Sequence, residues 1–218
     1  MPLPIVSGVK PPWITELGGV ASEHPPVASR LGLDVLNLGG NAVDAAITTS
    51  LALALTQPHL GGLGGDFFAM IYMAREGGRV YFLNASGWAP RRLSRELLMQ
   101  RGGLNAVPIR GPLSPVVPGL LAGGLHAMWR RFGTSEWKSL VRPIVETARK
   151  GFPASPSFVK AIESLRSDIV NDNDFKSVYP INARPWDLIR IEPLVKTFEL
   201  IMEHGPTYFT EGRLARLS

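Results

Sequence analysis

The sequence contains no cysteine among its 218 residues. This absence excludes disulfide bonds, thiolate metal sites and cysteine nucleophiles, and it favours a reducing compartment. Charged residues are also few, at 19% of the chain, whereas 45% of the residues are hydrophobic. Such a composition is typical of a globular protein with a packed core, and the length allows one large domain or two small ones.

The sequence also lacks a long uninterrupted hydrophobic run. The longest candidate, from Ala42 to Leu55, is broken by Asp44 and by the polar segment 48–50, so no membrane-crossing helix is predicted. The first 19 residues hold several prolines and one lysine but no apolar run of seven, which argues against a secretory signal. We therefore expect a soluble, cytoplasmic protein without a membrane partner.

Positive charge gathers in one segment of the chain. The net charge is +5, and residues 91–110 carry five arginines against the single acidic residue Glu96. Such a segment can bind nucleic acid, an anionic substrate or an acidic protein, or it can form a solvated face. We prefer the solvated face and expect no nucleic-acid partner, since no helix-turn-helix, zinc-finger or RNA-binding motif is legible.

Hydrophobic spacing predicts a mixture of helices and strands without internal repeats. Asn41 is a good N-cap for a helix that is apolar nearly all round and ends at Pro58, so this helix should be buried. Residues 66–73 and 79–84 suit the two strands of an antiparallel hairpin. Further expected features are a strand within 18–24, helices at 25–40, 118–133, 143–151, 157–170 and 192–204, a turn at 137–140 and a polar break at 171–175.

Four glycines, at positions 61, 62, 64 and 65, join the buried helix to the hairpin. We prefer tight helix-to-strand packing as their role, with the lining of a substrate channel as the alternative. A phosphate-binding loop is disfavoured, because the run leads into a strand and no Gly-Lys-Ser/Thr follows. Asp66, which follows the run, is expected to orient backbone amides of its own loop.

Three segments resemble the γ-glutamyltranspeptidase family, in the family's order. Residues 21–68, with the motif "GGNAVDA" and the glycine run, resemble its amino-terminal signature. Residues 116–156 and 197–215 resemble two later blocks, so the likeness extends over roughly residues 18 to 217. We accordingly expect an N-terminal arm at 1–17 and a large-subunit portion at 18–218.

The resemblance implies an α+β fold, as the helix-rich portion of a four-layer α-β-β-α N-terminal nucleophile hydrolase sandwich. Members of the family cut themselves before a threonine, whose hydroxyl then attacks an amide carbonyl while its own α-amine serves as the base. All the blocks found here belong to the large subunit, and no threonine of this chain follows the cleavage pattern. The resemblance therefore implies no catalytic residue in this chain and no cofactor.

A second departure from the family concerns the substrate. Where the transpeptidases have Asp-x-Arg-Glu-x-Ala-Pro, with the arginine holding a substrate carboxylate, this chain reads "NASGWAP". Asn84 stands at the aspartate position and Ser86 at the arginine position. A serine cannot neutralise a carboxylate, so we expect a less polar or differently charged acyl group, with Trp88 lining its pocket. Arg91 and Arg92 lie one turn beyond and either can reach back towards an anion, although surface charge is the preferred role; Arg91 completes the candidate substrate-binding set.

Other candidate groups point to structure more than to chemistry. The four histidines, at positions 24, 59, 126 and 204, show no metal-ligand spacing, and hydrogen-bonded structural roles are preferred for them. Asp34 and Asp44 are not interpreted as paired catalytic carboxylates, because Asp44 is explained by the start of its helix. No metal site is assigned.

Two hypotheses remain. In the first, the chain is part of a γ-glutamyltransferase-like amidohydrolase or acyltransferase whose partner is a threonine-led small subunit or C-terminal segment, and whose substrate is a small-molecule amide. A heterodimer or heterotetramer is compatible with it. In the second, the chain is a non-catalytic binding or scaffold protein built on half of that fold. The first predicts an exposed apolar sheet face that a partner covers.

Overall fold

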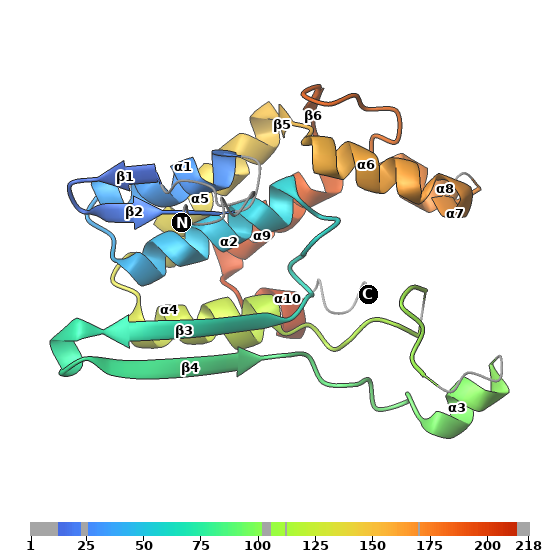
Figure 1. The fold of residues 1–218 in the computed structure, drawn as a ribbon, viewed down its shortest axis with the longest axis horizontal. Helices are drawn as coiled ribbons and strands as arrows, with labels where there is room; N and C mark the ends of the chain where they lie inside the picture. The colour runs from blue at the N-terminus through green and yellow to red at the C-terminus, as the bar shows by residue number, and fades with distance from the viewer. Residues whose placement is uncertain (1–12, 23–25, 102–105, 112, 170, 213–218) are drawn as a thin grey trace, which may run out of the picture.

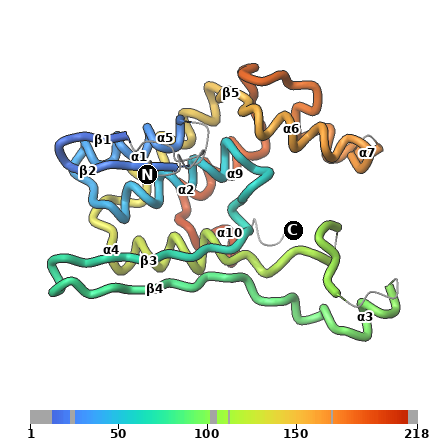
Figure 2. The backbone as a smooth tube through the Cα atoms, in the orientation of Figure 1, coloured from blue at the N-terminus to red at the C-terminus, as the bar shows by residue number. Residues whose placement is uncertain are grey.

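The fold was obtained as a computed structural model, and it describes residues 13–22, 26–101, 106–111, 113–169 and 171–212. A small hairpin, a long hairpin and a short pair of strands distant in sequence lie against a group of helices (Figures 1 and 2). The helices are α1 (Pro26–Asn37), α2 (Ala42–Thr56), α3 (Arg95–Gln100), α4 (His126–Phe132), α5 (Trp137–Lys150), α6 (Pro156–Ser164), α7 (Arg166–Ile169), α8 (Asn173–Val178), α9 (Glu192–His204) and α10 (Tyr208–Glu211), with a 3-10 turn η1 (Ala74–Glu76) and a π-helical turn η2 (Leu120–Leu125). The strands are β1 (Trp13–Thr15), β2 (Gly18–Val20), β3 (Phe67–Met73), β4 (Arg79–Ala85), β5 (Phe152–Pro153) and β6 (Leu188–Ile189).

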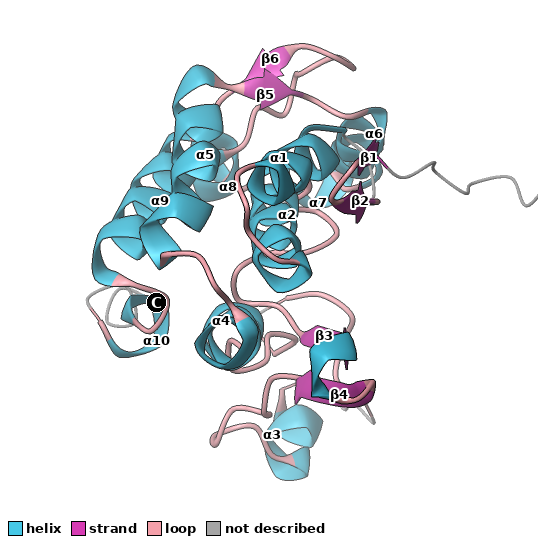
Figure 3. Cartoon of the chain, turned by 90° about the vertical axis from the view of Figure 1, so that its left-hand side faces the viewer, coloured by secondary structure: helices cyan, strands magenta, loops and turns pink. Residues whose placement is uncertain are grey.

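Helix α2 is the centre of the hydrophobic core. It packs against α1 and α5, and α5 in turn packs against α9, so that these four helices form one packed group, here called the helical layer (Figure 3). Eleven of the fifteen residues of α2 are buried. Its start is fixed by a capping box, in which the Asn41 side chain accepts from the Asp44 amide at 2.9 Å and the Asp44 carboxylate accepts from the Asn41 amide at 3.1 Å. The predicted buried helix and its N-cap are confirmed.

The predicted hairpin is also confirmed. Strands β3 and β4 pair antiparallel, from Phe67 opposite Ala85 to Met73 opposite Arg79, and the turn between them uses Gly77 and Gly78 with positive φ. One face packs against η2, where Gly124 comes so close to the Phe67 ring that no side chain would fit there. The opposite face is exposed. Its apolar side chains are those of Phe68, Met70, Tyr72, Val80 and Phe82, all more than half exposed.

Three expected boundaries were wrong. Helix α5 runs without a break through Pro143, because its buried face begins at Trp137 and the packing of that face outweighs one lost backbone hydrogen bond. The helix expected at 157–170 ends at Ser164 and is followed by the separate turn α7, while Val170 lies outside the described residues. The polar segment 171–175 is not a plain break, since Asp172 caps the short helix α8 by accepting from the Phe175 amide.

The helix expected at 118–133 has an irregular first part. Residues 120–125 form the π-helical turn η2, and the α-helical part, α4, covers only residues 126–132. The amide of Gly119 bonds to the Gly65 carbonyl at 3.3 Å, and that of Leu120 bonds to the same oxygen at 2.7 Å. The glycine loop therefore holds the start of this helix.

Several elements had no clear signal in the sequence. Strand β1 lies within the expected arm 1–17 and pairs with β2, whereas residues 1–12 are outside the described part; the domain boundary stays a prediction. The pair β5–β6 joins segments 35 residues apart, so it depends on tertiary structure. No helix among the described residues is long and apolar enough to cross a membrane. The location of the protein in the cell stays a prediction.

Candidate substrate-binding site

The segment 84–88, which departs from the family motif, forms the loop that leaves β4. Its backbone lies directly against residues 116–119. The Val117 amide donates to the Trp88 carbonyl at 2.9 Å. A β-carbon on Gly87 would collide with the Val117 carbonyl, and one on Gly119 would collide with the Ala85 carbonyl, so glycine is required at both positions.

Asp66 fixes the middle of this loop. Its carboxylate accepts a hydrogen bond from the Gly87 amide at 2.7 Å. The expectation that Asp66 orients amides of its own loop was therefore wrong in the choice of partner, because Gly87 lies 21 residues away in sequence. Within the glycine loop itself, the Gly65 amide bonds to the Gly62 carbonyl instead. No local signal in the sequence identifies the contact between Asp66 and Gly87.

Between the two segments lies a small hollow of about 190 Å³, lined by residues 84–88, 117–119 and 123. Asn84 shapes one wall, because its side-chain oxygen accepts from the Ser86 amide at 2.9 Å and closes a local turn. Ser86 is exposed, and Trp88 is exposed over 83% of its surface. The arrangement presents a hydroxyl, an amide and an indole to a small ligand, and the lining residues contribute no formal charge.

The structure thus brings together three of the four predicted substrate-binding residues. Asn84, Ser86 and Trp88 line the hollow, whereas Arg91 does not; Arg91 and Arg92 lie in an exposed turn after Pro90. The substrate-binding roles of all four predicted residues stay predictions. Position in the family motif was the signal that found the three lining residues, and Gly119, which shapes the same hollow, carried no such signal.

The glycine run does not pack as expected. A β-carbon added to Gly61 or Gly62 would have no atom within 4 Å. At Gly64 it would make only ordinary van der Waals contacts. None of the four glycines has a positive φ. Neither crowding nor backbone conformation within the described residues requires glycine at positions 61 and 62.

Asp44 is the most densely bonded polar side chain of the described part. Besides capping α2, its carboxylate accepts from the Thr134 amide and hydroxyl and from the Ser135 amide and hydroxyl, at distances between 2.6 and 3.2 Å. The carboxylate is fully buried. The sequence explained only its capping role; the structure shows that Asp44 also ties α2 to the loop after α4. Asp34 is half-exposed and pairs with Arg30 on the same helix, so the two aspartates do not share a site.

The histidines show no common site. Both ring nitrogens of His59 are buried and have no hydrogen-bond partner among the described residues, and burial lowers the pKa of this side chain. The expectation of a hydrogen-bonded His59 was therefore wrong. Burial, aided by the charge of Arg130, also lowers the pKa of His126, and His204 stacks on Tyr208. His24 lies outside the described residues, in which no three potential metal ligands cluster.

Several threonine hydroxyls serve the fold. Thr48 donates to the Leu140 carbonyl at 3.1 Å, Thr134 to Asp44, and Thr56, Thr147 and Thr197 each to the carbonyl one helical turn earlier. Thr49 is buried and its hydroxyl has no partner among the described residues. None of these contacts resembles a nucleophile beside a base, although the absence of a nucleophile from the chain stays a prediction.

Comparisons with known proteins agree with one another. The family model described as Gamma-glutamyltranspeptidase matches residues 28–217. A glutathione hydrolase proenzyme of Bacillus subtilis is 32% identical over 206 residues, a match that covers 91% of this chain and 34% of that relative. This chain therefore spans about a third of the length of the curated relatives it matches.

Solved structures extend the agreement to the fold. The γ-glutamyltranspeptidase of Helicobacter pylori is similar with a TM-score of 0.85 and 29% identity, over 95% of this chain and 60% of that one. A cephalosporin acylase of Bacillus halodurans is similar with a TM-score of 0.79 and 29% identity, over 88% of this chain and 37% of that one. The helical layer, the hairpin and the family match lead to one conclusion: this chain belongs to the γ-glutamyltranspeptidase family and corresponds to its large-subunit portion.

Proposed function

We propose that this chain is the large-subunit part of a γ-glutamyltransferase-like amidohydrolase or acyltransferase. The nucleophile is the N-terminal threonine of a segment outside these 218 residues, which forms an acyl intermediate and passes it to water or to an amino acceptor. The family relationship supports the reaction class. The hollow beside Ser86 supports a role for this chain in shaping the acyl pocket.

The exposed face of the hairpin supports an assembled protein. Strand β3 is apolar at every position, yet Phe68, Met70 and Tyr72 are exposed in the chain alone. A strand with this composition is typical of a sheet that is covered on both faces. The partner therefore supplies the second sheet of the sandwich, and its threonine-led strand reaches the hollow at the end of β4.

The acyl group differs from γ-glutamate in this proposal. A transpeptidase holds the substrate carboxylate with an arginine at the position of Ser86, and loss of a charge-assisted pair costs about 2–5 kcal/mol. No charged side chain lines the hollow to replace it. A cephalosporin acylase is among the similar solved structures beside γ-glutamyltranspeptidases, so the fold is compatible with an acyl group other than γ-glutamyl.

The test uses a fusion protein, in which the 218 residues are followed by the part of the Bacillus subtilis relative that follows its matched region. Hydrolysis of γ-glutamyl-p-nitroanilide is compared with that of butyryl-p-nitroanilide. Ser86→Arg should raise kcat/KM for the γ-glutamyl anilide relative to the butyryl anilide by roughly 30-fold, the equivalent of about 2 kcal/mol. Gln100→Arg adds the same charge on α3, away from the hollow, and should not change the ratio.

Efficient γ-glutamyl turnover by the fusion protein without the Ser86→Arg change would contradict the proposed substrate class. Complete inactivity on both anilides, together with a compact monomer of the 218 residues that binds no hydrophobic dye, would instead favour the scaffold hypothesis. The observation behind that alternative is the structural use of the threonine hydroxyls described above.

A further inference from the structure

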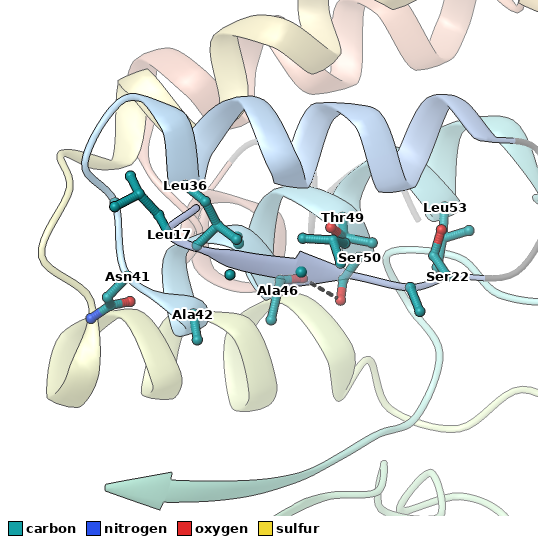
Figure 4. A pocket seen from close by; sticks show the side chains of 15 residues that line it. Leu17, Ser22, Leu36, Asn41, Ala42, Ala46, Thr49, Ser50 and Leu53 are labelled. Atoms are coloured by element: carbon teal, nitrogen blue, oxygen red, sulfur yellow. Dashed lines mark hydrogen bonds between the residues drawn. The ribbon is translucent and has the colours of Figure 1, made fainter. Parts of the chain in front are cut away.

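The hollow between α2 and the hairpin β1–β2 has a volume of about 510 Å³, and none of its described lining residues is ionisable (Figure 4). Its polar side chains already serve the fold. The Ser50 hydroxyl donates to the Ala46 carbonyl at 2.8 Å, and Asn41 caps α2. The Thr49 hydroxyl has no partner among the described residues, but it faces α1, where a β-carbon on Gly32 would collide with it. This hollow therefore does not select a ligand by charge.

The hollow beside Ser86 differs, because a carboxylate stands at its border. Asp66 accepts a hydrogen bond from the amide of Gly87, which lines this hollow, at 2.7 Å. The residue before it, Gly65, accepts through its carbonyl from the amide of Gly119 at 3.3 Å, and Gly119 lines the hollow from the second segment. Asp66 therefore lies where the two lining segments meet.

The carboxylate of Asp66 keeps capacity for a further partner. The bond to Gly87 occupies one oxygen, whereas a carboxylate can accept on both. Asp66 is exposed, and no ion pair or second hydrogen bond of the described residues involves it. A formal negative charge therefore stands beside the hollow without a cation of the described part to neutralise it.

This charge has the opposite sign to the arginine that a transpeptidase carries at the position of Ser86. Among the described residues, Asp66 is the only ionisable side chain hydrogen-bonded to a residue that lines the hollow. A negative charge attracts an ammonium group and repels a carboxylate. The exposed indole of Trp88 lines the same hollow, and an aromatic face likewise attracts a cation.

We propose that Asp66 is a specificity-determining residue, whose free carboxylate oxygen binds an ammonium group on the acyl chain of the substrate. The substrate class is an amide whose acyl chain carries an amino group and lacks a carboxylate at that place. The assignment rests on the proposed function, which puts the acyl group in the hollow beside Ser86. The hydrogen bond from Gly87 holds Asp66 in position for this contact.

Binding can be measured without catalysis, by NMR spectroscopy of the isotopically labelled 218-residue chain. The amide signal of Gly87 is followed during titration with 4-aminobutyramide, butyramide and the monoamide of glutarate, which carry a positive, no and a negative charge. We expect the cation to bind about fivefold more tightly than the neutral amide, the upper range for one exposed ion pair, and the anion to bind most weakly. Added salt should reduce the difference. Absence of any difference among the three amides, whether all bind or none does, would overturn the proposal.

Asp66→Asn separates charge from structure, because an asparagine oxygen can still accept from the Gly87 amide. We expect this variant to bind the cation and the neutral amide equally. Asp172→Asn is the matched control, since Asp172 is also exposed and also accepts from one backbone amide, that of Phe175 at 2.8 Å, but on α8. It should leave the preference unchanged. A preference for the cation that survives Asp66→Asn would restrict Asp66 to a structural role and overturn the proposal.

The fusion protein extends the test to turnover. Its kcat/KM for 4-aminobutyryl-p-nitroanilide should exceed that for butyryl-p-nitroanilide by about fivefold, after subtraction of the rate without protein, and Asp66→Asn should remove this ratio. Charge-selective binding by the 218-residue chain together with an inactive fusion protein contradicts only the proposed function. An active fusion protein whose ratio does not respond to Asp66→Asn contradicts only the role of Asp66.

Discussion

The helical layer and the hairpin of this chain differ in how completely their apolar and polar groups are covered by the described residues. In the helical layer, α2 buries eleven residues, and the carboxylate of Asp44 accepts hydrogen bonds from five donor groups, on Asn41, Thr134 and Ser135. In the hairpin, one face is packed and the other exposes large apolar side chains. The helical layer covers its apolar side chains from within the described residues, whereas the hairpin leaves one apolar face uncovered.

The same contrast appears among polar groups. Asp44 and Gln57 stand at the two ends of α2, and both are almost completely buried. The carboxylate of Asp44 is surrounded by donors, but the carboxamide of Gln57 has none among the described residues. Burial alone therefore does not identify a binding position. An unpartnered buried group is the exception that needs an explanation, since an uncompensated polar group is costly to bury.

The largest effect is expected where the helical layer is most complete. Asp44→Ala removes the buried carboxylate that accepts from the amides and hydroxyls of Thr134 and Ser135, and a hydrogen bond to a charged group contributes about 1.5–3 kcal/mol. We expect a loss of at least about 3 kcal/mol in the free energy of unfolding, measured by urea denaturation followed by circular dichroism. Asp34→Ala removes a half-exposed carboxylate of α1 and should cost less than about 1 kcal/mol. Equal losses for the two variants would contradict the assigned role of Asp44.

Replacement of glycine by alanine should reduce stability by an intermediate amount at a crowded position and hardly at all at an open one. Gly119→Ala forces a methyl group against the Ala85 carbonyl, and overpacking of this kind costs about 1–3 kcal/mol. Gly61→Ala meets open space and should leave the stability of the 218-residue chain nearly unchanged. Thermal unfolding of the two variants checks this difference. A destabilised Gly61→Ala chain would mean that the loop is packed more closely than described.

The sequence predicted best what short-range signals determine. The capping residue Asn41, the apolar run of α2 and the two strand segments of the hairpin depend on signals within a few positions, and they were identified correctly. Pro143 misled because its local preference for a helix start is outweighed by packing along the whole of α5. Family resemblance, and not spacing, identified segment 84–88 as a candidate site.

Long-range contacts could not be read from the sequence. The bonds from residues 134 and 135 to Asp44 span about ninety positions, and the bond from Gly87 to Asp66 spans 21. The close approach of Gly87 and Gly119 to neighbouring carbonyls likewise depends on how two loops meet. The glycine run shows the reverse case: it is conspicuous in the sequence, but the described residues leave its first two members unexplained.

The exposed face of the hairpin should influence association more than stability. Replacement of Met70 and Phe82 together by threonine removes a cross-strand apolar pair that is exposed in the chain alone. We expect the double variant to bind less hydrophobic dye and to self-associate less in sedimentation velocity experiments. Leu188→Thr removes an exposed apolar side chain on β6 and serves as the control. If the unmodified chain is a monomer that binds no hydrophobic dye, the hairpin does not expose an apolar face in solution, and the difference between the two regions disappears.

The smallest expected effect is a pH dependence that originates at His59. Burial lowers the pKa of its imidazole below the ordinary value of about 6.5, so the unfolded chain binds this proton more readily than the folded one. The contribution of His59 to stability is therefore present above pH 6.5 and is lost as the pH falls below that value. His126 changes in the same direction, because burial and Arg130 lower its pKa as well.

The measurement is the free energy of unfolding at pH 7.5 and at pH 5.5, taken for the unmodified chain and for His59→Leu. Leucine cannot be protonated and suits the neighbouring ring of Phe158, so the difference between the two pH values should shrink in this variant. His204→Asn, at an exposed position of α9, serves as the control replacement. An unchanged difference in His59→Leu would mean that the ring is hydrated in solution.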